Sequence, residues 1–477
     1  MLKSIADLLR IHTATAFNSL YPEAKIEEKD ILISETKPDF TGDYTIVLFP
    51  FVKSLKMNPA TLGEALGNYL VNNNDEYCGH QTVAGFLNIS ITDTYWSHYL
   101  NECDIEYLFK ELDRNPKKIM VEYSSPNTNK PLHLGHLRNN FLGVAIANIL
   151  KEVGNEVTKS CVVNDRGVHI CKSMIACQRF GNGATPQSTQ TKGDHFVGEY
   201  YVKFNDAYKE EVDILVNQGM SKEVAEEEAP IMKATQQMLL DWEAGKPEVM
   251  SLWNEMNGWV YEGFDVTYDA IGSTFDKVYY ESNTYLLGKD LVEEGLKKGV
   301  FYQKEDGSVW IDLTADGLDE KIVRRRDGTS VYITQDIGLA VEKQKEYQLE
   351  ESIYVVGDEQ NYHFKVLKLI CQRLGLAGAD GIFHLSYGMV ELPSGKMKSR
   401  EGTVVDADDL VAEMKRLAQV QTEAAGKTEG FKEEELKELY DTIGVGALKF
   451  YLLRVDPKKK MIFNPEESID LHGFTAT

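Results

Sequence analysis

The fold is most clearly indicated by one continuous segment, Val121-Glu-Tyr-Ser-Ser-Pro-Asn-Thr-Asn-Lys-Pro-Leu-His-Leu-Gly-His-Leu-Arg138. It leaves an apolar strand predicted at residues 118–123 and enters a helix predicted at 134–153, and another strand is predicted at 156–163. Strand, helix and strand in this order are typical of a parallel sheet. The sequence therefore predicts an α/β fold with a Rossmann-like, doubly wound parallel sheet, whose ligands bind at the carboxyl ends of the strands.

The junction between this strand and helix carries the tetrapeptide His133-Leu-Gly-His136. A helix N-terminus attracts anions, because its first backbone N–H groups lack partners and the helix dipole is positive there. His133 and His136 can donate hydrogen bonds to phosphate oxygens, and Gly135 leaves room for a flat base against the backbone. The pattern favours chemistry at a nucleotide's α-phosphate, although histidines beside a glycine are also common as surface or core residues.

Composition sets further bounds on the class of protein. A length of 477 residues is too great for one core, so several domains are expected. The net charge of −24 argues against a nucleic-acid partner unless basic residues gather in a local patch. The six cysteines form no C-x-x-C pair, which disfavours a structural metal and a disulfide framework. Neither a signal peptide nor an apolar run of membrane-spanning length is recognisable, so the cytoplasm is the expected location.

A small α+β domain is predicted ahead of the sheet domain, over residues 1–112. Strands rich in β-branched and aromatic residues are predicted at 45–50 and 85–91, with a helix at 58–70 between them.

The sheet domain is predicted over residues 113–395, with a helical insertion at 171–262 where the strand and helix alternation lapses. Residues 396–477 are predicted to form a loop followed by helices. Further strands of the sheet are predicted at four places: 275–280, 308–313, 352–357 and 382–387.

A second chemical element lies on a loop predicted between a strand and a helix, at residues 392–405. Lys396, Lys398 and Arg400 stand close together there, beside glycines. Cations on such a loop can stabilise the negative charge that develops around a reacting phosphate. A solvated basic turn is the alternative interpretation of three charges alone, and the order of the two elements along the chain favours the phosphate site.

The two elements together resemble the signature sequences of class I aminoacyl-tRNA synthetases. The detailed resemblance is to the arginyl-tRNA synthetase family, and it extends over essentially the whole chain. Six segments carry it: 122–127, 133–138, 332–337, 356–364, 387–390 and 395–400.

This resemblance implies a reaction and its partners. Arginine and ATP would give arginyl-adenylate and pyrophosphate, and the arginyl group would then pass to the terminal ribose of the arginine tRNA. The substrate carboxylate attacks, so catalysis rests on positioning and charge stabilisation rather than on a protein nucleophile. Mg²⁺ is expected with ATP, held mainly by the phosphates, and the protein is expected to be a monomer. The resemblance also implies that activation of arginine needs bound tRNA.

The resemblance places the arginine substrate among acidic and polar side chains. Tyr332 and Asp336 are four residues apart, hence on one face of a helix, and a carboxylate suits a guanidinium. Asp336 taken alone would more often be a surface carboxylate. The other side chains implied at the arginine site are Glu281 and Gln360 for the guanidinium, and Glu122, Ser125 and Asn127 for the α-amino and carboxylate groups.

The resemblance implies which residues bind ATP, and at one position this sequence departs from the family pattern. The implied ATP-binding residues are His133, Gly135, His136, His363, Met389, Val390 and Lys396. Ser399 stands where the second signature usually has its final lysine. Lys130, just before the first signature, is the preferred substitute cation, and Lys398 is the alternative.

Contacts to tRNA are implied at both ends of the chain. Phe86 and Asn88 match an aromatic and amide pair that reads an unstacked base, although Phe86 could equally be a core residue. Arg454 and the lysines at 458–460 could track phosphates or form a solvated turn. The chain ends where the family usually continues into a helical anticodon-binding domain, so weak tRNA binding and poor charging are expected.

Two other classes compete with this interpretation. A nucleotidyltransferase with the same sheet would carry the histidine tetrapeptide but not the pair Tyr332 and Asp336. A non-catalytic RNA-binding relative would have little use for intact signatures. Pyrophosphate exchange with each amino acid, in the presence of tRNA, distinguishes the three.

Overall fold

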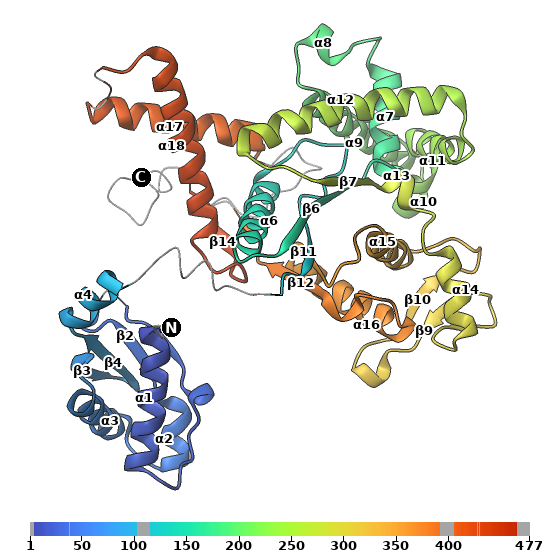
Figure 1. The fold of residues 1–477 in the computed structure, drawn as a ribbon. Coiled ribbons are helices and arrows are strands. Elements are labelled where there is room, and N and C mark those ends of the chain that lie inside the picture. The colour runs from blue at the N-terminus through green and yellow to red at the C-terminus, as the bar shows by residue number, and fades with distance from the viewer. Residues whose placement is uncertain are drawn as a thin grey trace. The chain divides into compact units, whose positions relative to one another are not determined.

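The computed structural model describes residues 4–37, 39–102, 115–391, 405–426, 428 and 430–464. The chain divides into two compact units, residues 1–112 and 113–477, and each is described by itself (Figure 1). In the described residues no helix is both long enough and apolar enough to cross a membrane.

The first unit is a four-stranded antiparallel sheet with helices. Its strands pair in the order β1-β2-β4-β3, with Thr45 opposite Asn88 and Val47 opposite Phe86. The predicted strand at 45–50 ends at Val47, because Pro50 lies in the first turn of a helix, where its fixed φ is favourable. The elements of this unit are α1 (Ile5–Leu20), β1 (Ile33–Glu35), β2 (Tyr44–Val47), α2 (Phe49–Leu55), α3 (Pro59–Asn73), β3 (Tyr77–Val83), β4 (Phe86–Ile91) and α4 (Asp93–Glu102).

The second unit is built on the predicted doubly wound parallel sheet, which is confirmed. Its five strands have the order β12-β11-β5-β6-β7, so the direction of winding reverses between β5 and β11. Ligands of such sheets bind at this reversal. The strands are β5 (Lys118–Glu122), β6 (Glu156–Val163), β7 (Lys277–Tyr280), β11 (Glu351–Gly357) and β12 (Ile382–Tyr387).

Three helices connect these strands or lead into them. Helix α6 (Leu134–Glu152) follows β5, α15 (Tyr332–Tyr347) precedes β11, and α16 (Asn361–Leu374) joins β11 to β12. Figure 1 shows α6 and α15 beside the parallel strands. Helix α6 therefore begins at the carboxyl end of β5, where the sheet reverses its winding.

Helices fill the chain between β6 and β7. They share one apolar core with α6, α17 and α18, centred on wholly buried residues such as Leu137, Met174 and Leu448. The helices are α7 (Val168–Phe180), α8 (Pro186–Thr189), α9 (Gly193–Asn217), α10 (Lys222–Glu228), α11 (Pro230–Glu243) and α12 (Pro247–Ile271).

One predicted strand of the parallel sheet is wrong. The residues predicted at 308–313 form β9 (Val309–Ile311), which lies in a separate antiparallel sheet of order β10-β9-β8. A short apolar run does not reveal which sheet a strand joins, because burial is similar in both. The neighbouring elements are α13 (Glu281–Thr284), α14 (Lys289–Lys297), β8 (Tyr302–Gln303) and β10 (Lys321–Arg324).

The last described elements pack against α6 and against the segment that follows β12. Helices α17 (Ala407–Ala424) and α18 (Glu433–Leu453) pack against each other, and α18 also packs on α6. Strand β13 (Val390–Glu391) then pairs in parallel with β14 (Met461–Ile462). The end of the described chain therefore supports the segment that follows β12.

Candidate active site

The first signature forms a tight turn in which two histidine rings lie close together, tilted by 35° to each other. His133 caps helix α6, and its Nδ1 accepts a hydrogen bond from the Gly135 N–H at 3.1 Å. The His133 N–H donates to Nδ1 of His136, also at 3.1 Å, and the ring centroids are 3.9 Å apart. A Cβ at position 135 would lie 3.0 Å from Cε1 of His133, so any larger residue there would have to displace the His133 ring slightly.

Both imidazoles in this turn are neutral. Burial, and then the charge of Lys130, lowers the pKa of His133 to about 4. Burial likewise lowers the pKa of His136 well below its ordinary value. Because each Nδ1 accepts a backbone hydrogen bond, each neutral ring carries its proton on Nε2. The turn therefore offers two Nε2–H donors beside a helix N-terminus, which suits phosphate oxygens.

Buried asparagines that sequence reasoning missed hold the lead-in to this turn. Ser124 and Ser125 adopt positive φ angles of 70° and 47°, which strain a residue other than glycine. The Ser124 N–H donates to Oδ1 of Asn139 at 2.5 Å, and Nδ2 of Asn140 donates to the Ser124 hydroxyl at 3.1 Å. The sequence feature that could have predicted their role is the pair of asparagines on the sheet-facing side of helix α6.

The two residues on α15 that are predicted to bind the substrate arginine, Tyr332 and Asp336, lie near a histidine. Asp336 Oδ2 is 2.6 Å from Nε2 of His363, which stands on α16. His363 was assigned to the ATP side, and the structure brings it against a residue of the implied arginine site. Tyr332, one turn before Asp336, is 72% exposed, so its ring is accessible. Gln360 ends a short 3₁₀ turn just before α16.

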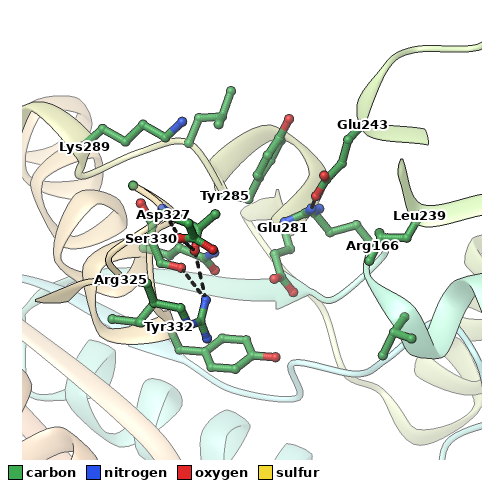
Figure 2. A pocket seen from close by; sticks show the side chains of 16 residues that line it. Arg166, Leu239, Glu243, Glu281, Tyr285, Lys289, Arg325, Asp327, Ser330 and Tyr332 are labelled. Carbon is green, nitrogen blue, oxygen red and sulfur yellow. Dashed lines mark hydrogen bonds and ion pairs between the residues drawn. The ribbon is translucent and has the colours of Figure 1, made fainter. Parts of the chain in front are cut away.

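A pocket of about 670 Å³ opens beside these residues (Figure 2). Glu281 and Tyr332 both line it, and Figure 2 shows Arg166 close to Glu281. Burial first, and then Asp165 and Asp336, raises the pKa of Glu281 to about 7, while Arg166 lowers it. The pocket thus has a carboxylate wall whose charge appears near neutral pH.

Arg166 is a cation of the pocket that sequence reasoning missed. Its guanidinium lies 3.9 Å from the ring centre of Tyr285 and 5.0 Å from that of Trp242. Its Nη2 is 3.0 Å from Oε1 of Glu243. Through this stacking and ion pair, the guanidinium connects the pocket lining to the helices between β6 and β7.

Glu122 lies at the end of β5 and is paired within the protein. Its carboxylate contacts Nζ of Lys343, a residue of α15 whose side chain is only 2% exposed. The rings of Tyr354 and Tyr279 lie 4.9 Å and 5.6 Å from the same ammonium group. The resemblance assigns Glu122 to the substrate's α-amino group, and the structure gives it an internal partner that joins β5 to α15.

The other two residues assigned to the substrate's polar end lie close to the first signature. The Ser125 N–H donates to the Tyr123 carbonyl at 3.1 Å. Asn127 forms an isolated parallel bridge with Asn164, just past the end of β6. The segment 123–127 is therefore tied to the carboxyl ends of two neighbouring strands.

The segment assigned to adenine is held by a buried arginine. Arg138 has no exposed surface, and its Nη1 donates to the Gly388 carbonyl at 2.7 Å. The Met389 carbonyl accepts from the Met461 N–H at 3.2 Å, and Val390 pairs with Met461 across β13 and β14. Arg138, three residues after Gly135 on the same helix, thus fixes Met389 and Val390 relative to the first signature.

The second signature, with Lys396, Lys398 and Arg400, lies outside the described residues. The described chain resumes at Val405, whose carbonyl accepts from the Leu134 N–H at 3.0 Å. Lys130 lines a pocket of about 270 Å³ together with His133. Lys130 and the end of the second signature's loop are thus both placed next to the first signature.

The implied tRNA contacts have different environments. Phe86 is 41% exposed and meets Phe49 edge to face at 5.2 Å, so an aromatic surface is accessible there. Asn88 is only 3% exposed, and its Oδ1 accepts from the Thr45 hydroxyl at 2.7 Å. Arg454 lies over the ring of Tyr451 at 4.1 Å.

Comparison with known proteins agrees with this geometry. The profile "Arginyl tRNA synthetase N terminal domain" matches residues 4–91, and "tRNA synthetases class I (R), catalytic domain" matches residues 105–464. The arginine–tRNA ligase of Flavobacterium psychrophilum is 54% identical over 99% of this chain and 80% of its own length. That of Amoebophilus asiaticus is 53% identical over 98% and 78%. The arginyl-tRNA synthetase structure of Thermus thermophilus has a TM-score of 0.66 at 22% identity, covering 98% of this chain and 79% of that one.

The doubly wound sheet and its histidine turn, with these matches, define a class I aminoacyl-tRNA synthetase. Within that class, the chain belongs to the arginyl-tRNA synthetase family. It is an ATP-dependent ligase, and its substrates are arginine, ATP and tRNA. The net charge of −24 was therefore a misleading argument against a nucleic-acid partner, because a whole-chain sum says nothing about local surfaces.

Proposed function

We propose that arginine binds in the pocket of Figure 2, with its guanidinium directed to Glu281, which lines the pocket, and to Asp336, which lies one helical turn after the lining residue Tyr332. Support comes from two carboxylates on different elements, close enough that Asp336 raises the pKa of Glu281. A guanidinium offers donors on two sides and pairs well with carboxylates on both. Tyr332 would cover the guanidinium and Gln360 would accept from it, while Glu122, Ser125 and Asn127 would serve the α-amino and carboxylate groups.

ATP is proposed to bind across the first signature. The Nε2–H groups of His133 and His136 would donate to phosphate oxygens, with Gly135 against the base. Met389 and Val390 would form the wall for adenine, and Lys130, Lys396 and Lys398 would supply positive charge to the phosphates. Mg²⁺ would enter with ATP, bound mainly through phosphate oxygens.

The division of labour along the chain is also a proposal. Residues 1–112 would contact the tRNA elbow through Phe86 and Asn88. Residues 113–395 would catalyse, and 396–477 would carry the second signature and, with Arg454, contact the tRNA stem. The enzyme is proposed to act as a monomer in the cytoplasm, where its partner tRNA is used in translation.

The pH dependence of arginine binding tests the placement in this pocket. Only ionised Glu281 attracts the guanidinium, and the pKa of Glu281 is about 7. As the pH falls from 8 to 6, the ionised fraction drops about tenfold, so KM for arginine should rise about tenfold. Pyrophosphate exchange in the presence of tRNA measures this constant at each pH.

Glu281→Gln isolates the carboxylate in that experiment. The variant should have a raised KM for arginine that no longer changes across this pH range, with KM for ATP unchanged. Glu293→Gln is the matched control, because Glu293 lies on α14 and pairs with Arg324 away from the pocket lining. A pH response that persists in Glu281→Gln would place the arginine elsewhere.

A second test concerns the cation that replaces the missing signature lysine. Lys130→Ala should lower kcat of pyrophosphate exchange about a hundredfold, because one preplaced charge at the reacting phosphate is worth that much. Lys151→Ala, at the far end of α6, should leave the rate unchanged. If Lys130→Ala is as active as the wild type while Lys398→Ala is inactive, the cation is Lys398.

A further inference from the structure

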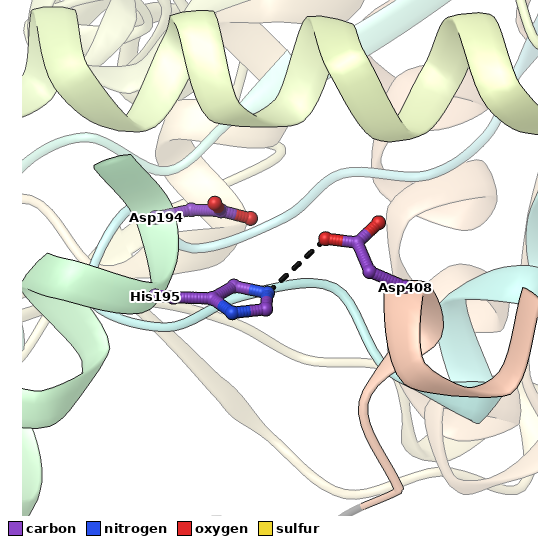
Figure 3. Close-up of side chains that lie close together, drawn as sticks. All are labelled: Asp194, His195 and Asp408. Carbon is purple, nitrogen blue, oxygen red and sulfur yellow. Dashed lines mark ion pairs between the residues drawn. The ribbon is translucent and has the colours of Figure 1, made fainter. Parts of the chain in front are cut away.

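An ionic junction joins the helices between β6 and β7 to the start of α17 (Figure 3). Nζ of Lys192 lies 2.5 Å from Oδ2 of Asp408 and 3.1 Å from Oδ2 of Asp194, which has no exposed surface. Nε2 of His195 lies 3.2 Å from Oδ2 of Asp406 and 3.1 Å from Oδ2 of Asp408. Two cations thus face three carboxylates across two segments more than 200 positions apart in sequence, as the 216-residue separation of Lys192 and Asp408 shows.

The junction does not have the character of a metal site. Asp194, His195 and Asp408 have ligand atoms close enough for one ion. However, the ammonium group of Lys192 already lies between Asp194 and Asp408. The Thr267 hydroxyl donates to the other oxygen of Asp408 at 2.8 Å. Protein cations and a hydroxyl therefore already occupy the space between these carboxylates, and the junction holds the two segments together.

This junction reaches the first signature through Asp406. The side chain of Asp406 caps α17 by accepting from the Asp408 N–H at 2.8 Å. The residues on either side of Asp406 bond to the residues on either side of His133. In detail, the Ala407 N–H donates to the Leu132 carbonyl and the Leu134 N–H donates to the Val405 carbonyl, both at 3.0 Å. A displacement of Asp406 would therefore move His133.

The turn has an apolar side and a polar side. Leu132, Leu134 and Ala407 are buried in the shared apolar core, whereas His133, His195 and Asp406 line a pocket of about 270 Å³. On the pocket side, close packing does not hold the side chains of His133 and Asp406. The ion pairs of His195 span the gap between α9 and the backbone bridge. The contact with Asp406, and then that with Asp408, raises the pKa of His195 to about 10, so the pairs persist through neutral pH.

We propose that His195 is a positioning residue that holds Asp406 against the first signature and so fixes the Nε2–H donor of His133. His195 itself touches no substrate. The inference rests on the proposed placement of ATP at His133, and it adds a residue from the helices between β6 and β7 to the machinery of that site.

A double-mutant cycle tests this proposal in the full chain. His195→Gln keeps a polar side chain but removes the charge, and it should lower kcat of pyrophosphate exchange about tenfold with KM for arginine unchanged. His133→Asn alone should be more strongly impaired. If His195 acts only through His133, adding His195→Gln to His133→Asn should cause no further loss. His195→Lys, which restores the cation, should recover part of the rate.

Arg179→Gln is the matched control, because it removes a cation that pairs at 2.6 Å with Glu211 among the same helices, away from the first signature. Its rate should equal that of the wild type. Should His195→Gln fail to fold, Thr267→Val, which removes one bond to Asp408, should give a smaller loss in the same direction. Additive losses in the cycle, or a normal rate in both His195→Gln and Thr267→Val, would overturn the proposal while leaving ATP at His133. A normal rate in His133→Asn would overturn both.

Discussion

Asp336→Asn should lower kcat/KM for arginine about a thousandfold, because it removes the charge of the carboxylate that we propose pairs with the substrate guanidinium. Nε2–H of His363 donates to Oδ2 of the Asp336 carboxylate, with 2.6 Å between the two atoms. That contact fixes the carboxylate and leaves its other oxygen for the substrate. The loss should be expressed in KM for arginine, with KM for ATP changed by less than about threefold.

Pyrophosphate exchange at saturating ATP and tRNA, with arginine varied, measures this loss. Asp380→Asn provides the matched control, since Asp380 bonds to Gln372 on the far side of α16. Lysine should not replace arginine in the variant, because the planar fork of acceptors is still built for a guanidinium. An unchanged KM for arginine in Asp336→Asn would remove α15 from the substrate site.

The local structure around the first signature could be predicted from the sequence because its elements are contiguous. Strand, turn and helix follow one another around His133 and Gly135, so local periodicity and the glycine predict both the sheet and the anion site. The sequence also predicted that Tyr332 and Asp336 share one face of a helix, since residues four apart lie about one turn apart. Their proximity to Glu281, which follows β7, depends on the tertiary fold.

The residues that sequence reasoning missed act across long separations. Lys343 meets Glu122 across 221 positions, and Arg138 meets Gly388 across 250. A lysine inside a helix pattern predicts an exposed face, so nothing in the sequence indicates that Lys343 is buried. The contact of His363 with Asp336 likewise depends on the packing of α16 against α15, which neither segment reveals by itself.

Lys343→Met should destabilise the unit formed by residues 113–477 by about 3 kcal/mol. The substitution removes the cation and leaves the Glu122 carboxylate, whose side chain is only 12% exposed, without its partner. All the tryptophans except Trp96 lie in this unit, so fluorescence-detected urea unfolding reports on it. Lys345→Met, in an exposed pair with Glu342 on the same helix, should change the free energy of unfolding by less than about 0.5 kcal/mol.

The double variant Lys343→Met and Glu122→Gln separates the two roles open to Glu122. Removing both charges should bring the free energy of unfolding to within about 1 kcal/mol of the wild type, since no unpaired charge stays buried. If Glu122 also binds the substrate's α-amino group, this stable variant should still have a raised KM for arginine. If Glu122 only joins β5 to α15, the double variant should bind arginine normally. A double variant as unstable as Lys343→Met would show that packing around the lysine stem, rather than the ion pair, stabilises this junction.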